Sequence, residues 1–421
     1  MNHWKESAEI LSRLAQLSAA GRRAALATVV GIAGSAYRRP GAKLLIEEAG
    51  GTVGSVSGGC LEADVREVAK AVLETGVPSL RHYNTGDEDI VFGLGLGCNG
   101  LVDVFVQPAT EGPLAAFAGR LQTLFAGDSP FALATVIQEV EEGERGGMMA
   151  VEAAEAGGSV HGTLGEGRGS GLGGESAALR ESKASGGSGS AEESEVREGG
   201  TIDRSGLSGG LGPRGGGADL DRLIAERARG LMPAGRSGVH QAAGRGVFVE
   251  VLPPPPHLVV CGAGDDARPL VAYAADAGFR VTLLDHRPAL LEAEWFPQAA
   301  RRAVARPDEP EIELPPASRS LAVVKTHSLA HDREWVRRLL AAGVPYVGVL
   351  GPRGRTATIL REIGAENAAG LEERVFGPVG LDLGADGPRQ VALAIVAELL
   401  AFVAGREPRH LSERREAIHA G

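Results

Sequence analysis

The sequence predicts an α/β protein with two domains, and three observations support this prediction. The chain has 421 residues, 43% of them hydrophobic, and a domain usually takes about 100–200 residues, so two or three cores can form. Beyond residue 257, strand-like and helical segments alternate, as in a parallel sheet covered by helices. Glycine is unevenly spread, with 19 of the 56 residues from Gly162 to Gly217. We expect an N-terminal mixed α/β domain with a disordered Gly/Ser-rich insertion, and a C-terminal Rossmann-like domain with a doubly wound parallel sheet.

The predicted N-terminal domain begins with a helix and contains an internal repeat. Apolar residues recur at helical spacing from Met1 to Ala20, which predicts an amphipathic helix. A strand-like run, Ala25–Val30, has a near copy at Ala132–Ile137, and a second short strand follows each copy, at 51–56 and 158–164. We expect a duplicated strand pair whose two halves join one sheet.

A Gly/Ser-rich insertion interrupts this domain. From about residue 165 to 217 no hydrophobic periodicity survives, and the composition is that of a flexible, poorly collapsing segment. Helical spacing returns at 219–232 and a strand-like run follows at 247–251, so the segment is an insertion and not a boundary. The boundary is expected at the stiff polyproline spacer 253–256, which assigns residues 1–252 to the first domain.

The second domain, residues 257–410, alternates strands with helices. Strand-like runs and helical patterns follow one another at 257–261, 266–277, 280–285, 320–325, 331–342, 346–350, 355–363 and 388–403. Short apolar runs of this kind are typical of buried parallel strands. The alternation predicts a doubly wound Rossmann-like sheet, and ligands of such sheets bind at the carboxyl ends of the strands.

Composition argues against several classes of function. The formal net charge is −11, and no basic stripe with interleaved aromatic residues is present, which argues against nucleic-acid binding. The longest apolar candidate, Val391–Ala404, is shorter than the ~20 residues of a membrane span and contains Glu398. The N-terminal pattern carries acidic residues, unlike a secretory signal. Three scattered cysteines, Cys60, Cys98 and Cys261, form no disulfide or zinc pattern, so we expect a cytoplasmic protein.

A glycine turn suited to a dinucleotide follows the first strand of the second domain. Gly262 and Gly264 fit the pattern G-x-G-x-x-A between a strand and a helix, and Asp285 stands about 20 residues later. The first glycine would form the turn, the second would admit a pyrophosphate, and Asp285 would accept a hydrogen bond from a ribose hydroxyl. Asp265 and Asp266 would repel that anion, so a turn kept for packing alone stays open as the alternative.

Two further loops follow strands at the same edge of the predicted sheet. His327 and His331 could ligate a metal from one helical face, but a third ligand is missing nearby, so capping and hydrogen-bonding roles are the alternative. Gly351–Arg355 offers free amides and two guanidiniums, including that of Arg353. This loop is either an anion cradle or a turn with solvated arginines.

Two cysteines of the first domain stand in glycine-rich turns. Cys60 follows Gly58 and Gly59 and precedes a helical run, and the positive end of a helix dipole favours a thiolate. Such a thiolate suits metal ligation or sulfur transfer, whereas a lone cysteine is more often an inert buried residue. Cys98 repeats the arrangement in a glycine-rich turn before a strand.

Two arginines stand on the loop after the first strand. Arg38 and Arg39 lie within Ser35–Gly41. Their guanidiniums suit a phosphate or a pterin-like anion.

These motifs resemble those of the XdhC/CoxI family, accessory proteins of molybdenum hydroxylases such as xanthine dehydrogenase and carbon monoxide dehydrogenase. The resemblance rests on Gly34–Ala42, Ser57–Glu62, Leu96–Cys98, Pro254–Gly264, Thr326-His327, Gly348–Arg353 and Pro378–Asp382. These segments occur in the family's order. Asp265 stands where the XdhC branch often carries histidine, and Lys325 where an apolar residue is usual, so the chain is closer to the CoxI-like side.

The resemblance implies a protein that binds the molybdenum cofactor, as molybdopterin or as a dinucleotide form of it. Such a protein protects the cofactor, helps it to acquire its terminal sulfido ligand from a cysteine desulfurase, and delivers it to an apo molybdenum hydroxylase. By resemblance, Cys60 contacts the molybdenum centre as a metal ligand, Cys98 is second, and Arg38 and Arg39 hold the anionic tail. A dinucleotide form would also give the Rossmann-like domain a pyrophosphate to bind. The chain would then be a non-catalytic assembly factor, and a homodimer is one assembly we consider.

Two other functions stay open from the sequence. An NAD(P)-dependent oxidoreductase would use the Rossmann-like domain for its cofactor, with His327 as its proton donor. An interaction scaffold with a vestigial nucleotide-binding fold would leave Cys60 replaceable.

Overall fold

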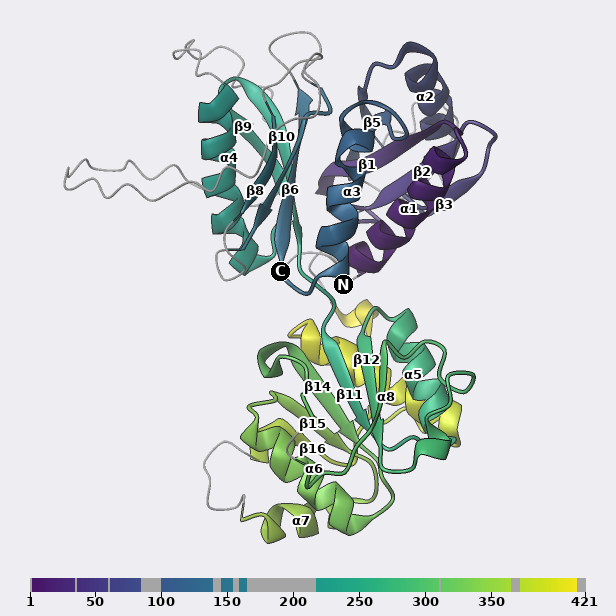
Figure 1. Cartoon of the computed structure of the whole chain (residues 1–421), viewed down its shortest axis with the longest axis vertical. Helices are drawn as coiled ribbons and strands as arrows, with labels where there is room; N and C mark the ends of the chain where they lie inside the picture. The colour runs from purple at the N-terminus through teal and green to yellow at the C-terminus, as the bar shows by residue number, and fades with distance from the viewer. Residues whose placement is uncertain are drawn as a thin grey trace, which may run out of the picture. The chain divides into compact units, whose positions relative to one another are not determined.

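The computed structural model describes residues 2–34, 36–59, 61–84, 100–138, 145–153, 159–164, 217–309, 312–364 and 372–414. The chain forms two compact units, one from His3 to Pro254 and the other from Pro255 to Glu413 (Figure 1). Apart from Gly217, the predicted insertion at 165–217 lies outside the described residues.

The N-terminal unit consists of two halves with the same order of helices and strands. The first half contains α1 (Asn2–Ala19), β1 (Ala24–Gly34), β2 (Lys43–Glu47), β3 (Thr52–Gly54), α2 (Glu62–Thr75), β4 (Ser79–Asn84) and β5 (Gly100–Pro108). The second half contains α3 (Gly112–Ala126), β6 (Phe131–Gln138), β7 (Met148–Glu152), β8 (Val160–Thr163), α4 (Gly217–Leu231), β9 (Gly238–Ala242) and β10 (Arg245–Leu252). Each half forms an antiparallel sheet: sheet A is ordered β3-β2-β1-β5-β4, and sheet B is ordered β8-β7-β6-β10-β9. The orders coincide when β1 is overlaid on β6, so the predicted duplication is confirmed and covers the whole of each half.

The expectation that both halves join one sheet is wrong, because the repeated strands β1 and β6 are both central. Strand β1 pairs with β2 and β5, and β6 pairs with β7 and β10. Each copy therefore has both edges occupied by strands of its own half, and neither edge is free for the other copy. Strands β2 and β7 were missed by the sequence patterns, which detected only β3 and β8 as the strands that follow the repeated run.

Positions of the two halves that coincide in this overlay, here called matched positions, have the same local geometry. Gly54 of β3 and Gly162 of β8 both have a positive φ, 88° and 79°. A Cβ built on Gly54 would lie 2.3 Å from the carbonyl oxygen of Lys43, and one on Gly162 would lie 2.6 Å from that of Met148. Lys43 and Met148 are matched as well, since each pairs with the same threonine position of its central strand. Both hairpins thus need glycine at the same place.

Helices α1 and α3 lie beside the strands of the two sheets (Figure 1). Their apolar side chains form a core with side chains of β1, β2, β6, β7 and β10. Helix α2 packs on the other face of sheet A, and α4 on the other face of sheet B. The amide N–H of Leu164, just after β8, donates to Asp221 Oδ1 of α4 at 2.8 Å. The chain ends on either side of the insertion are therefore held together by a direct hydrogen bond.

A buried ion pair lies between the two sheets. Lys43 Nζ of β2 is 2.5 Å from Glu250 Oε1 of β10 and also donates to the carbonyl oxygen of Gly41 at 3.0 Å. Lys43 is 7% exposed and Glu250 3%, and both border a cavity of about 40 Å³ lined mostly by apolar side chains. The matched positions hold the uncharged Met148 and Gln107. Only one of the two equivalent places therefore carries charge.

The C-terminal unit has the predicted Rossmann-like fold. It contains β11 (His257–Cys261), α5 (Ala267–Asp276), β12 (Arg280–Asp285), β13 (Arg301–Val304), β14 (Ser320–Val324), α6 (Leu329–Ala341), β15 (Tyr346–Val349), α7 (Arg353–Glu362), β16 (Val375–Phe376) and α8 (Pro388–Val403). The strands are parallel, in the order β13-β12-β11-β14-β15-β16. Helices α5 and α8 pack on one face, and α6 and α7 on the other. This arrangement is a doubly wound sheet, and its chain order reverses between β11 and β14.

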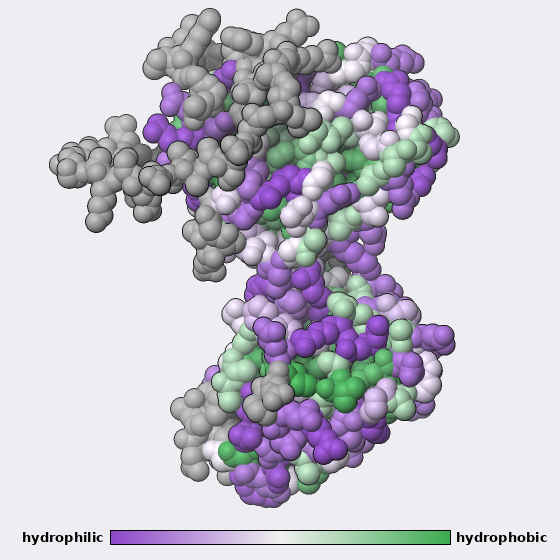
Figure 2. All heavy atoms as spheres, in the orientation of Figure 1, coloured by the Kyte–Doolittle hydropathy of each residue, from purple (hydrophilic) through white to green (hydrophobic). Residues whose placement is uncertain are grey.

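The surface of the C-terminal unit contains both hydrophilic and apolar areas. Figure 2 shows hydrophilic residues over most of its visible face, around an apolar area near the middle. Across the described parts of both units, every helix is too short or too polar to cross a membrane.

Candidate functional site

Three loops leave sheet A at the same end. Gly34, the last residue of β1, pairs with Gly100, the first residue of β5, and β4 ends beside them at Asn84. Strand β3 also ends on this side, because Gly54 pairs with the second residue of β2. The loops after β1, β3 and β4 carry, in that order, Arg38 and Arg39, then Gly58, Gly59 and Cys60, and then Cys98. The described strand ends from which these loops start therefore lie at one end of one sheet.

Cys60 and Cys98 themselves lie outside the described residues, but the loop that contains Cys60 is described on both sides of it. A Cβ built on Gly58 would lie 3.7 Å from the ring of Tyr37. Tyr37, on the loop after β1, therefore lies beside Gly58, on the loop after β3.

Glu62, the first residue of α2, fixes the loop before it. Its carboxylate accepts hydrogen bonds from Ser55 Oγ and from the backbone N–H of Ser57, both at 3.0 Å, and from Ser57 Oγ. Burial raises the pKa of Glu62, but the hydrogen bonds from Ser57 and Ser55 outweigh it, so the pKa lies below the ordinary value of a glutamate. The carboxylate therefore remains ionised at neutral pH and remains a strong acceptor.

Ser57 extends this anchoring to the residues next to Cys60. Its Oγ accepts hydrogen bonds from the N–H groups of Gly59 and Leu61, both at 3.1 Å. The backbone on both sides of Cys60 is therefore attached to one serine. The sequence patterns identified Ser57 only as part of the segment Ser57–Glu62 and predicted no role for it. A serine shortly before a glutamate at the start of a helix does indicate hydrogen bonds of this kind.

The two loop arginines have different surroundings. Arg38 forms an ion pair with Glu6 of α1, and its side chain is 22% exposed. Its Nε is buried without a hydrogen-bond partner in the described part of the chain. Arg39 is exposed, so its guanidinium is the more accessible of the two to an anion.

A histidine–aspartate pair, which sequence reasoning missed, lies near the same end of sheet A. His82 Nδ1 of β4 is 2.6 Å from Asp103 Oδ1 of β5. A Cβ built on Gly31 of β1 would lie 2.7 Å from Asp103 Oδ2, so the carboxylate rests on this glycine. The matched positions of sheet B hold Gln241 and Gly246. Of the two matched places, only the one in the half with the cysteine loops holds this pair.

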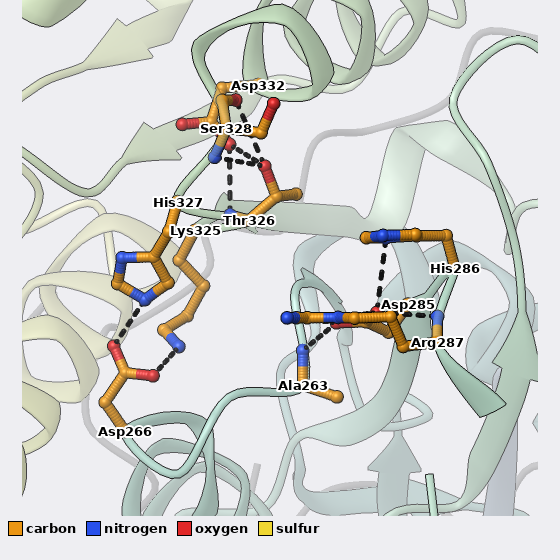
Figure 3. A network of polar contacts seen from close by, with 10 residues as sticks. All are labelled: Ala263, Asp266, Asp285, His286, Arg287, Lys325, Thr326, His327, Ser328 and Asp332. Carbon is orange, nitrogen blue, oxygen red and sulfur yellow. Dashed lines mark hydrogen bonds and ion pairs between the residues drawn. The ribbon is translucent and has the colours of Figure 1, made fainter. Parts of the chain in front are cut away.

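A second polar cluster lies at the carboxyl ends of β11, β12 and β14 (Figure 3). Asp266 Oδ1 is 2.6 Å from Lys325 Nζ, and Asp266 Oδ2 is 3.2 Å from His327 Nε2. The side chain of Lys325 is 2% exposed and that of His327 is 63% exposed. His327 has a φ of 61°, which residues other than glycine rarely adopt.

The charges in this cluster depend on one another. Burial lowers the pKa of Lys325, although its hydrogen bond to Asp266 opposes this effect. Burial raises the pKa of Asp266, but Lys325 and His327 outweigh it, so the pKa of Asp266 is lower than usual. Asp266 is therefore the anion that neutralises the buried lysine.

Asp285 at the end of β12 is fully engaged by protein donors. Its Oδ2 accepts from the N–H of Ala263 at 2.7 Å and from Arg287 Nη2 at 2.9 Å, and its Oδ1 accepts from the backbone N and Nε of Arg287 at 2.9 Å. Burial raises the pKa of Asp285, but the hydrogen bonds from Arg287 and Ala263 outweigh it and lower the pKa to about 2. The carboxylate that the sequence assigned to a ribose hydroxyl already has its own partners.

The predicted glycine turn forms and packs closely against β14. Gly262 has a φ of 118°, and a Cβ built there would lie 2.5 Å from the carbonyl oxygen of Lys325. A Cβ built on Gly264 would lie 2.9 Å from Asp266 Oδ1 and 4.0 Å from His327 Nε2. The space in front of the second glycine is therefore occupied by side chains of the protein itself.

The other predicted residues of this edge have separate environments. The ring of His331 packs on that of His286, with centroids 4.8 Å apart. The N–H of His331 donates to Ser328 Oγ, the N-cap of α6, so the capping alternative is confirmed for this loop. Arg353 is exposed at the start of α7. Within the described ranges, no group of three or more His, Cys, Asp or Glu side chains could hold a metal ion.

Cys261, at the end of β11, is fully buried. Burial raises the pKa of its thiol, so it stays protonated and unreactive. Cys261 is therefore a core residue.

Comparisons with known proteins cover both units. A family model described as the XdhC and CoxI family matches residues 17–84, and one described as the XdhC Rossmann domain matches residues 258–399. A protein of Bacillus subtilis (strain 168), described as a probable subunit of xanthine dehydrogenase, is 26% identical over 378 residues, which are 90% of this chain and 92% of that protein. The uncharacterized protein YqeB of Escherichia coli (strain K12) is 29% identical over 158 residues, 37% of this chain and 28% of that protein.

A solved structure shares the overall fold. It is described as a xanthine dehydrogenase from Bacillus halodurans, has a TM-score of 0.66 and 23% identity, and the match covers 94% of this chain and 96% of that one. The two family models match the first half of the N-terminal unit and then the C-terminal unit, in agreement with the motifs in the sequence. Both units of this chain are thus similar to domains of XdhC and CoxI proteins.

Proposed function

We propose that the protein is an accessory factor of a molybdenum hydroxylase, which binds the molybdenum cofactor, supports its sulfuration and transfers it to the apoenzyme. The accessory role is supported by the similarity of both units to the XdhC and CoxI family models and by the description of the Bacillus subtilis relative. The cofactor role is supported by one observation above all: the loops that carry Cys60, Cys98 and the two arginines leave sheet A at the same end.

The donor groups at this end of sheet A fit such a cofactor. A cysteine next to the start of α2 favours the thiolate form, which is a soft ligand and a sulfur nucleophile. Among the described residues, a Cβ built on Gly59 would meet no atom within 4 Å, so this part of the loop leaves room for a ligand. Arg39 offers an exposed guanidinium for an anionic tail. The bound cofactor would supply the metal centre that receives the sulfido ligand.

In this proposal, the residues of the loops at the end of sheet A have distinct roles. Cys60 contacts the metal centre, Cys98 assists, and the Glu62 network holds the backbone around Cys60. A cysteine desulfurase would supply the sulfur, and an apo hydroxylase of the xanthine dehydrogenase class would receive the cofactor. We place this work in the cytoplasm, where thiols stay reduced, and we treat a homodimer as part of the proposal.

Removal of single cysteines tests the proposal. The protein is purified from cells with intact cofactor synthesis, and bound molybdenum and pterin are measured for the parent, Cys60→Ala, Cys98→Ala and Cys261→Ala. Cys60→Ala should lower retention most, Cys98→Ala less, and Cys261→Ala, which removes a buried thiol of the other unit, not at all. Equal retention in the parent and all three variants would refute the assignment of Cys60.

The alternative of an NAD(P)-dependent oxidoreductase is less well supported by this geometry. Asp266 and His327 lie in front of the glycine that would admit a pyrophosphate. A purified protein that carries NAD(H), with neither molybdenum nor pterin, would favour this alternative.

A further inference from the structure

The Rossmann turn of the C-terminal unit is covered by a carboxylate of the protein itself. We propose that Asp266 is a built-in competitor of a ligand phosphate: its carboxylate occupies the place in front of Gly264 and holds Lys325 and His327, so that a nucleotide diphosphate binds this unit only when it displaces Asp266. This inference is independent of the cofactor role proposed for the N-terminal unit.

The first support is the position of the carboxylate. In a Rossmann turn the second glycine lacks a side chain so that a pyrophosphate can approach the backbone. Here Asp266 Oδ1 would lie 2.9 Å from a Cβ on Gly264, and His327 Nε2 would lie 4.0 Å from it. Figure 3 shows the side chains of Asp266 and His327 facing each other. A phosphate cannot enter while both remain there.

The second support is the charge of the partners. Lys325 is 2% exposed, and its Nζ donates to Asp266 Oδ1 at 2.6 Å. His327 Nε2 faces the other oxygen of the same carboxylate at 3.2 Å. A buried ammonium group needs an anion beside it, and a phosphate oxygen meets this need as well as a carboxylate oxygen does. Two anions on one lysine repel each other, so Asp266 and the ligand exclude one another.

The third support is that the neighbouring acid has a different task. Asp265 is 88% exposed and forms an ion pair with Arg268 at 3.0 Å. An open groove of about 640 Å³ begins at these two residues and is lined further by Arg389 and its neighbours. This groove would hold the rest of a bound nucleotide. Asp265 provides a matched control, because Asp265→Asn changes the net charge by the same amount as Asp266→Asn but does not release Lys325.

The test compares Asp266→Asn with Asp265→Asn by calorimetric titration of the full chain. ADP-ribose is the probe for a nucleotide diphosphate, and inorganic pyrophosphate is the probe for the anion alone. Asp266→Asn should bind ADP-ribose at least about tenfold more tightly than the parent, a change of roughly 1.4 kcal/mol, while Asp265→Asn should gain markedly less. Adding Lys325→Met to Asp266→Asn should abolish the gain, because the lysine is the group set free.

Two outcomes support the proposal and two overturn it. A gain for both probes, or for ADP-ribose alone, supports it and shows whether the nucleoside contributes. An equal gain in the two asparagine variants, or parent binding as tight as that of Asp266→Asn, overturns it. Asp266 stands at the N-cap position of α5, but its side chain makes no capping hydrogen bond. Asp266→Ser is therefore a second variant that removes the carboxylate without loss of a cap, and its thermal unfolding shows whether the fold persists.

Discussion

The buried pair of Lys43 and Glu250 allows a quantitative prediction, because the duplicated fold supplies an uncharged version of it. Lys43→Met leaves the carboxylate of Glu250, which is 3% exposed, without its partner at 2.5 Å. Removing one member of a buried pair costs about 3–5 kcal/mol. Glu250→Gln leaves Lys43 with uncharged acceptors, an amide oxygen in place of the carboxylate and the carbonyl oxygen of Gly41, so its buried charge is uncompensated and we expect a loss of similar size.

The double variant should behave differently. Lys43→Met with Glu250→Gln installs the residue types found at the matched positions, Met148 and Gln107. Replacement of both charges removes the desolvation cost together with the attraction, so stability should stay within about 1–2 kcal/mol of the parent. The two single substitutions should therefore be coupled by at least about 3 kcal/mol.

Hydrogen exchange followed by mass spectrometry measures this effect within the N-terminal unit. Peptides from β2 and β10 report its opening, and peptides from β11 and β14 of the C-terminal unit serve as the internal control. A loss of 3–5 kcal/mol also corresponds to a fall in unfolding temperature of roughly 6–20 °C for a domain of this size. Additive losses, with a double variant as unstable as the sum of the single ones, would refute the reasoning.

Three further predictions concern the cysteine loop, acid stability and the insertion. Ser57→Ala should speed hydrogen exchange of the amides of Gly59 and Leu61 about fivefold, since each loses an acceptor worth roughly 1 kcal/mol; unchanged exchange would show that the serine does not hold the loop. Asp285 has a pKa of about 2 in the fold against roughly 3.9 unfolded, so it stabilises the C-terminal unit above pH 4 and this contribution, about 2 kcal/mol, is lost as the pH falls from 4 to 2. Asp285→Asn should lack that pH-dependent component in urea unfolding, and an identical pH profile in parent and variant would contradict it. Deletion of residues 167–216 should leave thermal unfolding unchanged or raise stability by up to about 2 kcal/mol, because a hydrogen bond already joins the ends of β8 and α4 and a shorter loop costs less entropy; a collapsed transition would show that the segment supports the fold.

Local patterns in the sequence predicted many of the helices and strands. The number of sheets and the contacts between distant residues depend on long-range pairing, which these patterns do not encode. The alternation after residue 257 is local, and it was sufficient to predict the Rossmann-like sheet. The repeated run at Ala25 and Ala132 revealed the duplication, but the number of sheets depends on β2 and β5 pairing on either side of β1, which a single repeated strand does not encode. The Lys43–Glu250 pair joins residues separated by 207 positions, and it was not foreseen.

In the candidate sites too, contiguous motifs were recognised in the sequence and contacts between distant residues were not. The two acids after the glycine turn were equivalent in the sequence, and only the fold separates Asp266, which faces Lys325 from 59 residues away, from the exposed Asp265. The loop motifs around Cys60 were recognised because they are contiguous. The common end of sheet A from which these loops start, and the neighbouring His82–Asp103 pair, required the register of all five strands of that sheet.

The central claim is that the end of sheet A holds a molybdenum cofactor through Cys60. The most direct measurement is the molybdenum and pterin content of the protein purified from cells that make the cofactor, with Cys60→Ala alongside. We expect both components in the parent, in equal amounts, and a marked loss of both in the variant. A parent that carries neither molybdenum nor pterin would contradict it.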